Sequence, residues 1–149
     1  MLKDRLETDL RAAMKARDEL VTSTLRMTLA AVRNAEVSGK QARELSDDEV
    51  RAVLTAEAKK RREAATAFGD AGRAEQADRE RAEEGVLVGY LPTQLSDDEL
   101  ARVVGDALAG LDMTGKGAMG QAMKAAQAAV AGRAEGGRVA AEVRRRLAG

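Results

Sequence analysis

The segment with the clearest potential for anion chemistry in this 149-residue chain is Gly115-Lys116-Gly117-Ala118-Met119-Gly120. Glycines and a lysine before a helix are typical of phosphate loops, because the free N–H groups of a helix start bind anions. The P-loop pattern requires Gly-Lys followed by Ser or Thr, four residues after a first Gly. Here Lys116 is followed by Gly117, and no strand is predicted before it. The sequence therefore favours a flexible helix start, with Gly120 allowing a neighbouring helix to pack closely.

Carboxylates are the other residues that could do chemistry. Glu80, Glu83 and Glu84 form one cluster, and Asp97-Asp98-Glu99 forms another. Acid–base catalysis needs a pocket that raises the pKa of one carboxylate. The first cluster alternates with arginines and the second lies at a helix cap, so both are interpreted as solvated. Because the chain has no His and no Cys, the usual zinc ligands, a thiol nucleophile and an imidazole base are excluded. We expect no catalytic residues, no metal and no cofactor.

The balance of 25 basic and 25 acidic residues conceals a basic C-terminal segment. Residues 115–149 contain seven basic and two acidic side chains. Such an excess attracts nucleic-acid phosphates, although solvated helix faces often carry the same charge. Only Phe68 and Tyr90 are aromatic, and both lie outside this segment, so we expect recognition of a folded RNA and no stacking on unpaired bases. The candidate RNA-binding residues are Lys116, Lys124, Arg133, Arg138, Arg144, Arg145 and Arg146.

Helices are the elements expected to position these residues. The hexapeptides Leu45-Ser46-Asp47-Asp48-Glu49-Val50 and Leu95-Ser96-Asp97-Asp98-Glu99-Leu100 are nearly identical, and each predicts a helix start. In each, the serine is the N-cap and the glutamate three residues later completes a capping box. Capping accounts for every residue of the motif, so the paired aspartates do not indicate a metal site.

Apolar periodicity predicts an all-α fold. The core must come from Ala, Leu, Val and Met, because aromatic residues are scarce, and these residue types favour packed helices. Leu2, Leu6, Leu10 and Met14 mark the first helix. Six further helices are expected. The second helix has apolar residues at 25, 29 and 32 and ends at 38–39, and the next four helices span 47–68, 73–88, 97–110 and 117–131. The last helix has apolar residues at 139, 143 and 147.

Pro92 is the predicted domain boundary, because the residue before a proline is pushed out of the helical region. We expect a helical bundle of about four helices at residues 1–91 and a small three-helix domain at 92–149. No run of about 18 apolar residues occurs, which predicts no membrane span. The charged N-terminal residues are unlike a signal peptide, so a cytoplasmic location is expected.

Three separated stretches carry a family resemblance. Tyr90-Leu91-Pro92-Thr93-Gln94-Leu95-Ser96 resembles the YLPxQLS segment of the YqeY family. Met119-Gly120-Gln121-Ala122-Met123, followed by Gly132-Arg133-Ala134-Glu135-Gly136-Gly137-Arg138-Val139, resembles its MGxxM and GRADGxxV signature. The opening run from Leu10 to Asp18 is also similar to that of the family. The resemblance covers essentially the whole chain, with its motifs in the expected order.

The resemblance implies an all-helical protein whose C-terminal domain is similar to the tail of the aspartyl/glutamyl-tRNA amidotransferase B subunit (GatB). In that enzyme the tail helps to hold tRNA, while activation and amide transfer occur in other domains. The family label of carbon–nitrogen ligase with glutamine as amide donor is therefore read as inherited. The chain has neither a nucleotide-binding motif nor a Ser/Lys amidase arrangement.

Three functional hypotheses follow from these observations. The first is a non-catalytic accessory protein that contacts tRNA or another structured RNA through its C-terminal domain. The second is an adaptor that binds a protein partner and no nucleic acid. The third, an amidotransferase-associated enzyme, ranks last because the residues for that chemistry are missing.

Overall fold

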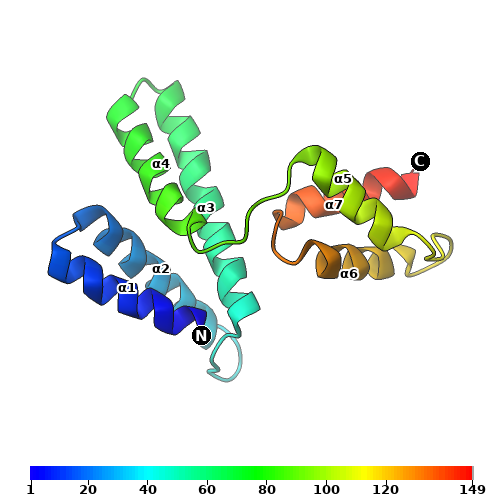
Figure 1. Cartoon of the computed structure of the whole chain (residues 1–149), viewed down its shortest axis with the longest axis horizontal. Helices are drawn as coiled ribbons and strands as arrows, with labels where there is room; N and C mark the ends of the chain where they lie inside the picture. Colours follow the sequence, from blue (N-terminus) through cyan, green and yellow to red (C-terminus); the bar gives the residue numbers. More distant parts are fainter. Residues whose placement is uncertain (149) are drawn as a thin grey trace. The chain divides into compact units, whose positions relative to one another are not determined.

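The computed structural model describes residues 1–148, and within that range the chain forms seven helices and no strand (Figure 1). The predicted all-α fold class is thereby confirmed. Contacts divide the chain into two compact units, Met1–Leu91 and Pro92–Gly149, here called the N-terminal and C-terminal units. Each has its own apolar core, and the two sets of core residues do not overlap. None of the helices in the described part of the chain is long and apolar enough to cross a membrane.

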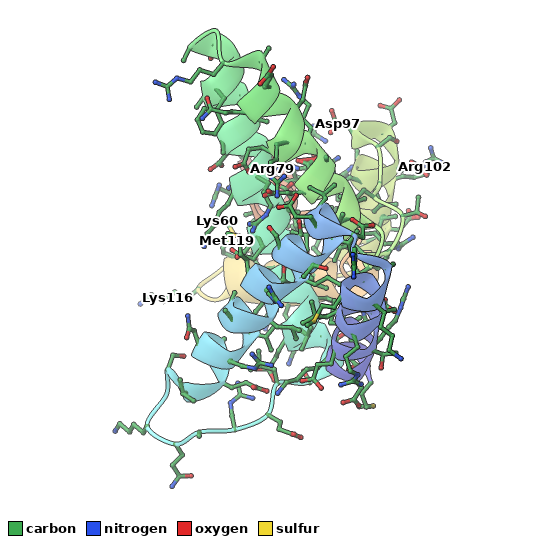
Figure 2. All side chains as sticks on the ribbon, turned by 90° about the vertical axis from the view of Figure 1, so that its left-hand side faces the viewer. Lys60, Arg79, Asp97, Arg102, Lys116 and Met119 are labelled. Carbon is green, nitrogen blue, oxygen red and sulfur yellow. The ribbon has the colours of Figure 1, made fainter. Side chains whose placement is uncertain are left out.

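The N-terminal unit consists of two helical hairpins. α1 (Leu2–Ala16) and α2 (Glu19–Val37) form the first, and α3 (Asp47–Asp70) and α4 (Ala74–Val88) form the second. The second hairpin extends well beyond the first (Figures 1 and 2). Its inner half shares an apolar core with α1 and α2, made of Leu2, Leu6, Leu25, Leu29, Val32, Val50, Leu54, Ala58 and Leu87.

Both predicted capping boxes are present. In the first, the Glu49 N–H donates to Ser46 Oγ at 3.2 Å, and the Ser46 N–H donates to Glu49 Oε1 at 3.1 Å. Ser96 and Glu99 make the same pair of bonds, at 3.1 Å and 3.0 Å. Each box satisfies N–H groups that the helix itself leaves without partners. The identical starts of α3 and α5 thus have a structural cause.

The interpretation of the Glu80 to Glu84 region as a solvated face was wrong for Glu83, which is only 7% exposed. Glu83 lies against Arg61 of α3, with Arg61 Nε and Glu83 Oε2 3.6 Å apart. Glu57, one turn before Arg61, is also buried, and its Oε1 lies 3.7 Å from Arg61 Nη1. Buried charges need such partners because desolvation penalises the charged forms. We call Glu57, Arg61 and Glu83 the Arg61 cluster.

The Arg61 cluster continues to the surface through Arg79. Its Nε donates to Glu83 Oε1 at 3.2 Å, and its two terminal nitrogens donate to the Glu19 carboxylate at 2.9 Å and 3.1 Å. The pKa of Glu19 is lowered, chiefly by these hydrogen bonds. Burial raises the pKa of the neighbouring Glu80, with the charge of Glu83 as a smaller cause. Charged side chains thus connect the start of α2 to α3 and α4.

Two further expectations were wrong. Met14, assigned to the apolar stripe of the first helix, is 47% exposed. It lies in the last turn of α1. Gly120 was expected to allow a close helix contact, but a Cβ built there would meet nothing within 4 Å.

The C-terminal unit packs α5 (Asp97–Leu108), α6 (Ala118–Val130) and α7 (Gly136–Ala148) around an apolar core. Every buried charged residue of the described chain lies in the N-terminal unit instead. Small side chains on α6 allow the three helices to approach closely. The core residues are Leu95, Leu100, Val104, Leu108, Ala122, Ala126, Val130, Ala134, Val139 and Val143.

Candidate nucleic-acid interface

The segment before α5 and the turn before α7 are hydrogen-bonded to each other. The Leu95 N–H donates to the Arg133 carbonyl at 2.7 Å. Gln94 Nε2 donates to the carbonyls of Pro92 and Gly132, at 2.9 Å and 3.3 Å. Two of the stretches singled out from the sequence therefore meet in one joint of the C-terminal unit.

The turn after α6 explains the glycine and the arginine of the second stretch. Ala131 and Gly132 both have positive φ angles, 52° and 78°, a conformation that glycine adopts without strain. Arg133 then folds back, and its Nε and Nη2 donate to the carbonyls of Val130 and Ala129, each at 2.9 Å. A cation at the C-terminus of a helix is favoured by the free carbonyls and by the helix dipole. Arg133 therefore caps α6.

Arg138 and Arg146 also bind main-chain oxygens within the unit. Arg138 Nη2 donates to the Leu95 carbonyl and to Asp97 Oδ1, both at 2.9 Å. Arg146 lies across α5, where its Nη2 donates to the Ala101 carbonyl at 2.5 Å. A Cβ at Gly105 would lie 2.8 Å from Arg146 Nη1, so glycine makes room for the guanidinium. These two arginines hold α7 against α5.

Arg145 is paired with a carboxylate on its own helix. Its Nη2 and Nε donate to the two oxygens of Glu142, at 2.6 Å and 3.1 Å. Glu142 also accepts from Arg146 Nε at 2.9 Å, and the hydrogen bond from Arg145 is the main cause of the lowered pKa of Glu142. The side chain of Arg145 remains 65% exposed, so a phosphate could approach it only in competition with Glu142.

Lys116, Lys124 and Arg144 are the remaining predicted residues. All three are exposed, and none makes a side-chain hydrogen bond or ion pair with any residue between 1 and 148. Lys116 stands in the loop between Gly115 and Gly117, whose φ angles of 87° and 86° require glycine. The loop and the end of α7 lie at the same end of the C-terminal unit (Figure 1). We call these three residues the free cations.

Met119 and Gly120, at the start of α6, are also exposed to solvent. Met119 is 41% exposed and Gly120 has no close neighbour, whereas Met123 packs against the core. Lys116 projects away from the ribbon in Figure 2. The fold therefore accounts for Met123 and leaves the first two residues of this motif available for contact with another molecule.

Tyr90 belongs to the packing of the N-terminal unit. Its hydroxyl donates to Asp9 Oδ2 at 2.5 Å, and the Arg5 guanidinium lies 4.8 Å from the ring centroid. Burial is the main cause that raises the pKa of Tyr90, followed by the bond to Asp9. Leu91 packs beside Tyr90 against the same core. The hydroxyl thus anchors the end of α4 to α1.

Sequence reasoning named the basic residues of the candidate interface but could not tell which of them have partners within the chain. Arg133, Arg138 and Arg146 have intramolecular acceptors, whereas the free cations have none. The capping role of Arg133 has a local signal, since a basic residue just after a glycine at a helix end is typical of a C-cap. The acceptors of Arg138 and Arg146 lie more than 40 positions away, at Leu95 and Ala101, so no local pattern indicates them.

No group of three or more acidic side chains in residues 1–148 is arranged to hold a metal ion. In the comparisons with known proteins, a family model described as Yqey-like protein matches residues 3–147. No curated protein matches the chain. The matched range includes all seven helices almost entirely.

Proposed function

This chain belongs to the YqeY-like protein family, and on that premise we propose that it is a non-catalytic cytoplasmic protein whose C-terminal unit contacts tRNA or another structured RNA. The free cations, Lys116, Lys124 and Arg144, make the phosphate contacts. The observation that carries the proposal is that these three exposed side chains have no carboxylate partner within the described chain and lie in the basic segment 115–149, which has seven basic and two acidic residues.

The glycine-flanked loop supports phosphate binding at Lys116. Its backbone has little side-chain cover, so an RNA strand can come close to the main chain. Phosphate contacts fix the position of a nucleic acid but carry no sequence information. Because both aromatic residues lie in the N-terminal unit, we expect recognition by shape and charge, with little dependence on base sequence.

Arg133 and Arg138 have an indirect role in this proposal. They hold the joint that places α6 and α7, and their guanidinium groups are already bound to oxygens of the chain. Substituting either would change RNA affinity by loosening the unit. A test of phosphate contact must therefore use the free cations.

The test is a titration of full-length protein with fluorescently labelled unfractionated tRNA at several salt concentrations. The variant Lys116→Ala/Lys124→Ala/Arg144→Ala is expected to weaken binding at least tenfold at low salt. It should also reduce the slope of log affinity against log salt by about 2–3, since each phosphate contact contributes about 0.9. Circular dichroism should show unchanged helix content.

A matched control removes three other exposed basic residues, all from the N-terminal unit. Lys15, Lys40 and Arg73 are exposed and have no side-chain partner in the described range, so changing all three to Ala alters the net charge equally. This variant should bind tRNA nearly as well as the native chain. Equal losses for the two variants would indicate a net-charge effect and contradict the proposed surface. Absence of tRNA binding at low salt would refute the function itself.

The family label of amide transfer has a separate test. The purified protein is expected to release no ammonia from glutamine, with or without ATP and tRNA. Measurable release that depends on the protein would contradict the non-catalytic part of the proposal.

A further inference from the structure

α2 carries a stripe of exposed, mostly apolar side chains. Met27, at its start, accepts a hydrogen bond from Arg61 Nη2 of α3 at 3.8 Å. Met27 is 53% exposed and Val37 is 64% exposed, with exposed Ala30 and Asn34 between them on α2. Spacings of three and four residues place these four side chains along one line of the helix. The stripe is about 15 Å long at 1.5 Å per residue.

Arg26 and Arg33 flank the stripe on α2, and Arg17 lies at the turn between α1 and α2. Arg17, Arg26 and Arg33 are exposed, and their side chains form no hydrogen bond or ion pair with the described residues. Arg26 and Arg33 are seven residues apart, so they lie on the same side of α2. This side of the hairpin therefore presents three positive charges beside apolar surface.

The acidic residues close to these arginines already have other partners. Glu19 binds Arg79 at 2.9 Å, and Glu36 binds Lys3 Nζ at 2.8 Å. Asp18 caps α2 by accepting from the Val21 N–H at 3.2 Å. The charge of Arg33 still lowers the pKa of Glu36, as a smaller cause than the hydrogen bond from Lys3, whereas no carboxylate of the described chain pairs with Arg17 or Arg26.

A shallow hollow of about 330 Å³ continues the surface at the turn between α1 and α2. It is lined by Met14, Arg17, Glu19, Thr22 and Arg26. Met14 supplies a flexible, polarisable side chain to its lining, and methionines of this kind adapt to the shape of a partner. We call the stripe, the three arginines and this hollow the hairpin face.

We propose that the hairpin face binds an amphipathic helix of a partner protein, with acidic residues on the helix opposite Arg17, Arg26 and Arg33. A helix of about 14–16 residues matches the length of the face and places apolar side chains along the stripe and in the hollow. Exposed methionine and valine favour a protein over RNA, because nucleic-acid surfaces offer little apolar area to bury against them. This proposal is independent of RNA binding by the C-terminal unit.

The test uses displayed peptides as the probe. A library of 16-residue helical peptides, with a fixed apolar stripe and all other positions randomised, is selected against the full-length protein. Selected peptides should be enriched in Asp and Glu over the input library. Amide chemical-shift changes on adding the best peptide should concentrate in α1 and α2.

Two variants test the contacts of the best peptide by fluorescence anisotropy. Ala30→Glu/Val37→Glu and Arg26→Ala/Arg33→Ala should each weaken binding at least tenfold, and neither changes a buried residue. Met119→Glu, on an exposed methionine of the C-terminal unit, is the matched control and should leave the affinity unchanged. Both hairpin variants should bind tRNA like the native chain.

Several results would overturn the proposal. These are a failure to select any peptide, selection without acidic enrichment, or shift changes that lie outside the hairpin face. Loss of tRNA binding in Arg26→Ala/Arg33→Ala would assign the face to RNA. Self-association by analytical ultracentrifugation that Ala30→Glu/Val37→Glu abolishes would assign it to a second copy of the chain.

Discussion

The two units use arginine in opposite ways. In the N-terminal unit, Arg61 is 5% exposed and is enclosed by Glu57 and Glu83, which are almost as deeply buried. In the C-terminal unit no charged residue of the described chain is buried, and Arg133 and Arg138 bind main-chain oxygens from the surface. One unit has charge inside its helix packing, while the other uses charge to hold helix ends and turns.

This difference follows from the side chains that α3 and α4 bring to their contact. Beyond Ala58, towards the turn between α3 and α4, the buried apolar side chains of these helices are the small Ala65 and Ala77, and α4 places Glu83 against Arg61. A buried ion pair can fill this space, but burying the charges costs desolvation free energy, so the pair stabilises the fold only slightly. Removing one member is costly, because the other charge then stays buried without a partner. An arginine that already has partners within the chain is a structural residue in either unit. Only arginines and lysines without partners are candidates for binding another molecule.

The largest effect is expected from Arg61→Ala. It leaves Glu57 and Glu83 buried without their cation, and breaking a buried pair in this way costs about 3–5 kcal/mol of unfolding free energy. Hydrogen exchange followed by mass spectrometry should show faster exchange in α3 and α4 and unchanged exchange in α5–α7. A loss below about 1 kcal/mol would show that the Arg61 cluster is not desolvated as described.

A companion variant separates loss of charge pairing from loss of packing. Glu57→Met/Arg61→Leu/Glu83→Met replaces the whole Arg61 cluster with apolar side chains and makes the N-terminal unit resemble the C-terminal one. Such replacements are typically neutral or stabilising by about 1–4 kcal/mol. Stability well below that of the native chain would mean that the charges supply specific geometry that apolar residues cannot replace.

The next effect in size is expected in the C-terminal unit. Arg133→Ala removes two charge-assisted hydrogen bonds to the end of α6 and should lower the unfolding free energy by about 2 kcal/mol. Exchange in α6 and in the 92–97 segment should quicken, while α1–α4 stay unchanged. If stability is unaffected and only RNA affinity falls, Arg133 is a binding residue and its capping role is wrong.

The helices and their caps could be predicted from the sequence because they depend on neighbouring residues. Ser46 and Glu49 are three positions apart, and the apolar stripe of Leu25, Leu29 and Val32 lies within two turns. Burial of Glu83 could not be predicted, since it depends on Arg61, 22 positions earlier on another helix. The candidate interface shows the same limit. The sequence shows that the segment is basic. It does not show that Arg146 is bound within the described chain while Lys116 is not, because that requires knowing that the Ala101 carbonyl lies next to Arg146.

The two capping boxes can also be compared, through the pKa values of their glutamates. The hydrogen bond from Arg43 is the main cause that lowers the pKa of Glu49 from 4.5 to about 2. The pKa of Glu99 is also lowered, mainly by the Ser96 N–H, and no arginine bonds to its carboxylate within the described chain. A carboxylate with a lowered folded-state pKa stabilises the fold above its unfolded pKa and loses that contribution as the pH falls through the folded value.

Stability of the native chain should therefore fall as the pH drops from 4.5 towards 2, with Glu49 contributing more than Glu99. Glu49→Gln should flatten the dependence of unfolding free energy on pH in that window more than Glu99→Gln does. Urea titrations at closely spaced pH values measure both slopes. The reverse order would show that the bond between Arg43 and Glu49 is too exposed to persist in solution.

The smallest effect is expected from separating the chain between Leu91 and Pro92. That the two units are separate domains stays a prediction, and it follows from cores that share no residue. Fragments 1–91 and 92–149 should each be helical, and the sum of their circular dichroism spectra should match that of the whole chain. A C-terminal fragment that fails to unfold cooperatively would contradict this, although domains of about 60 residues are only marginally stable.

The glycine beneath Arg146 has an evolutionary consequence. Any other residue at position 105 adds a Cβ 2.8 Å from Arg146 Nη1, so the guanidinium, the far end of a flexible side chain, must shift to make room. Gly105 and Arg146 should therefore change together among relatives of this chain, although 41 positions separate them. A relative with alanine at 105 should either carry a shorter side chain at 146 or hold its arginine in a shifted position over α5.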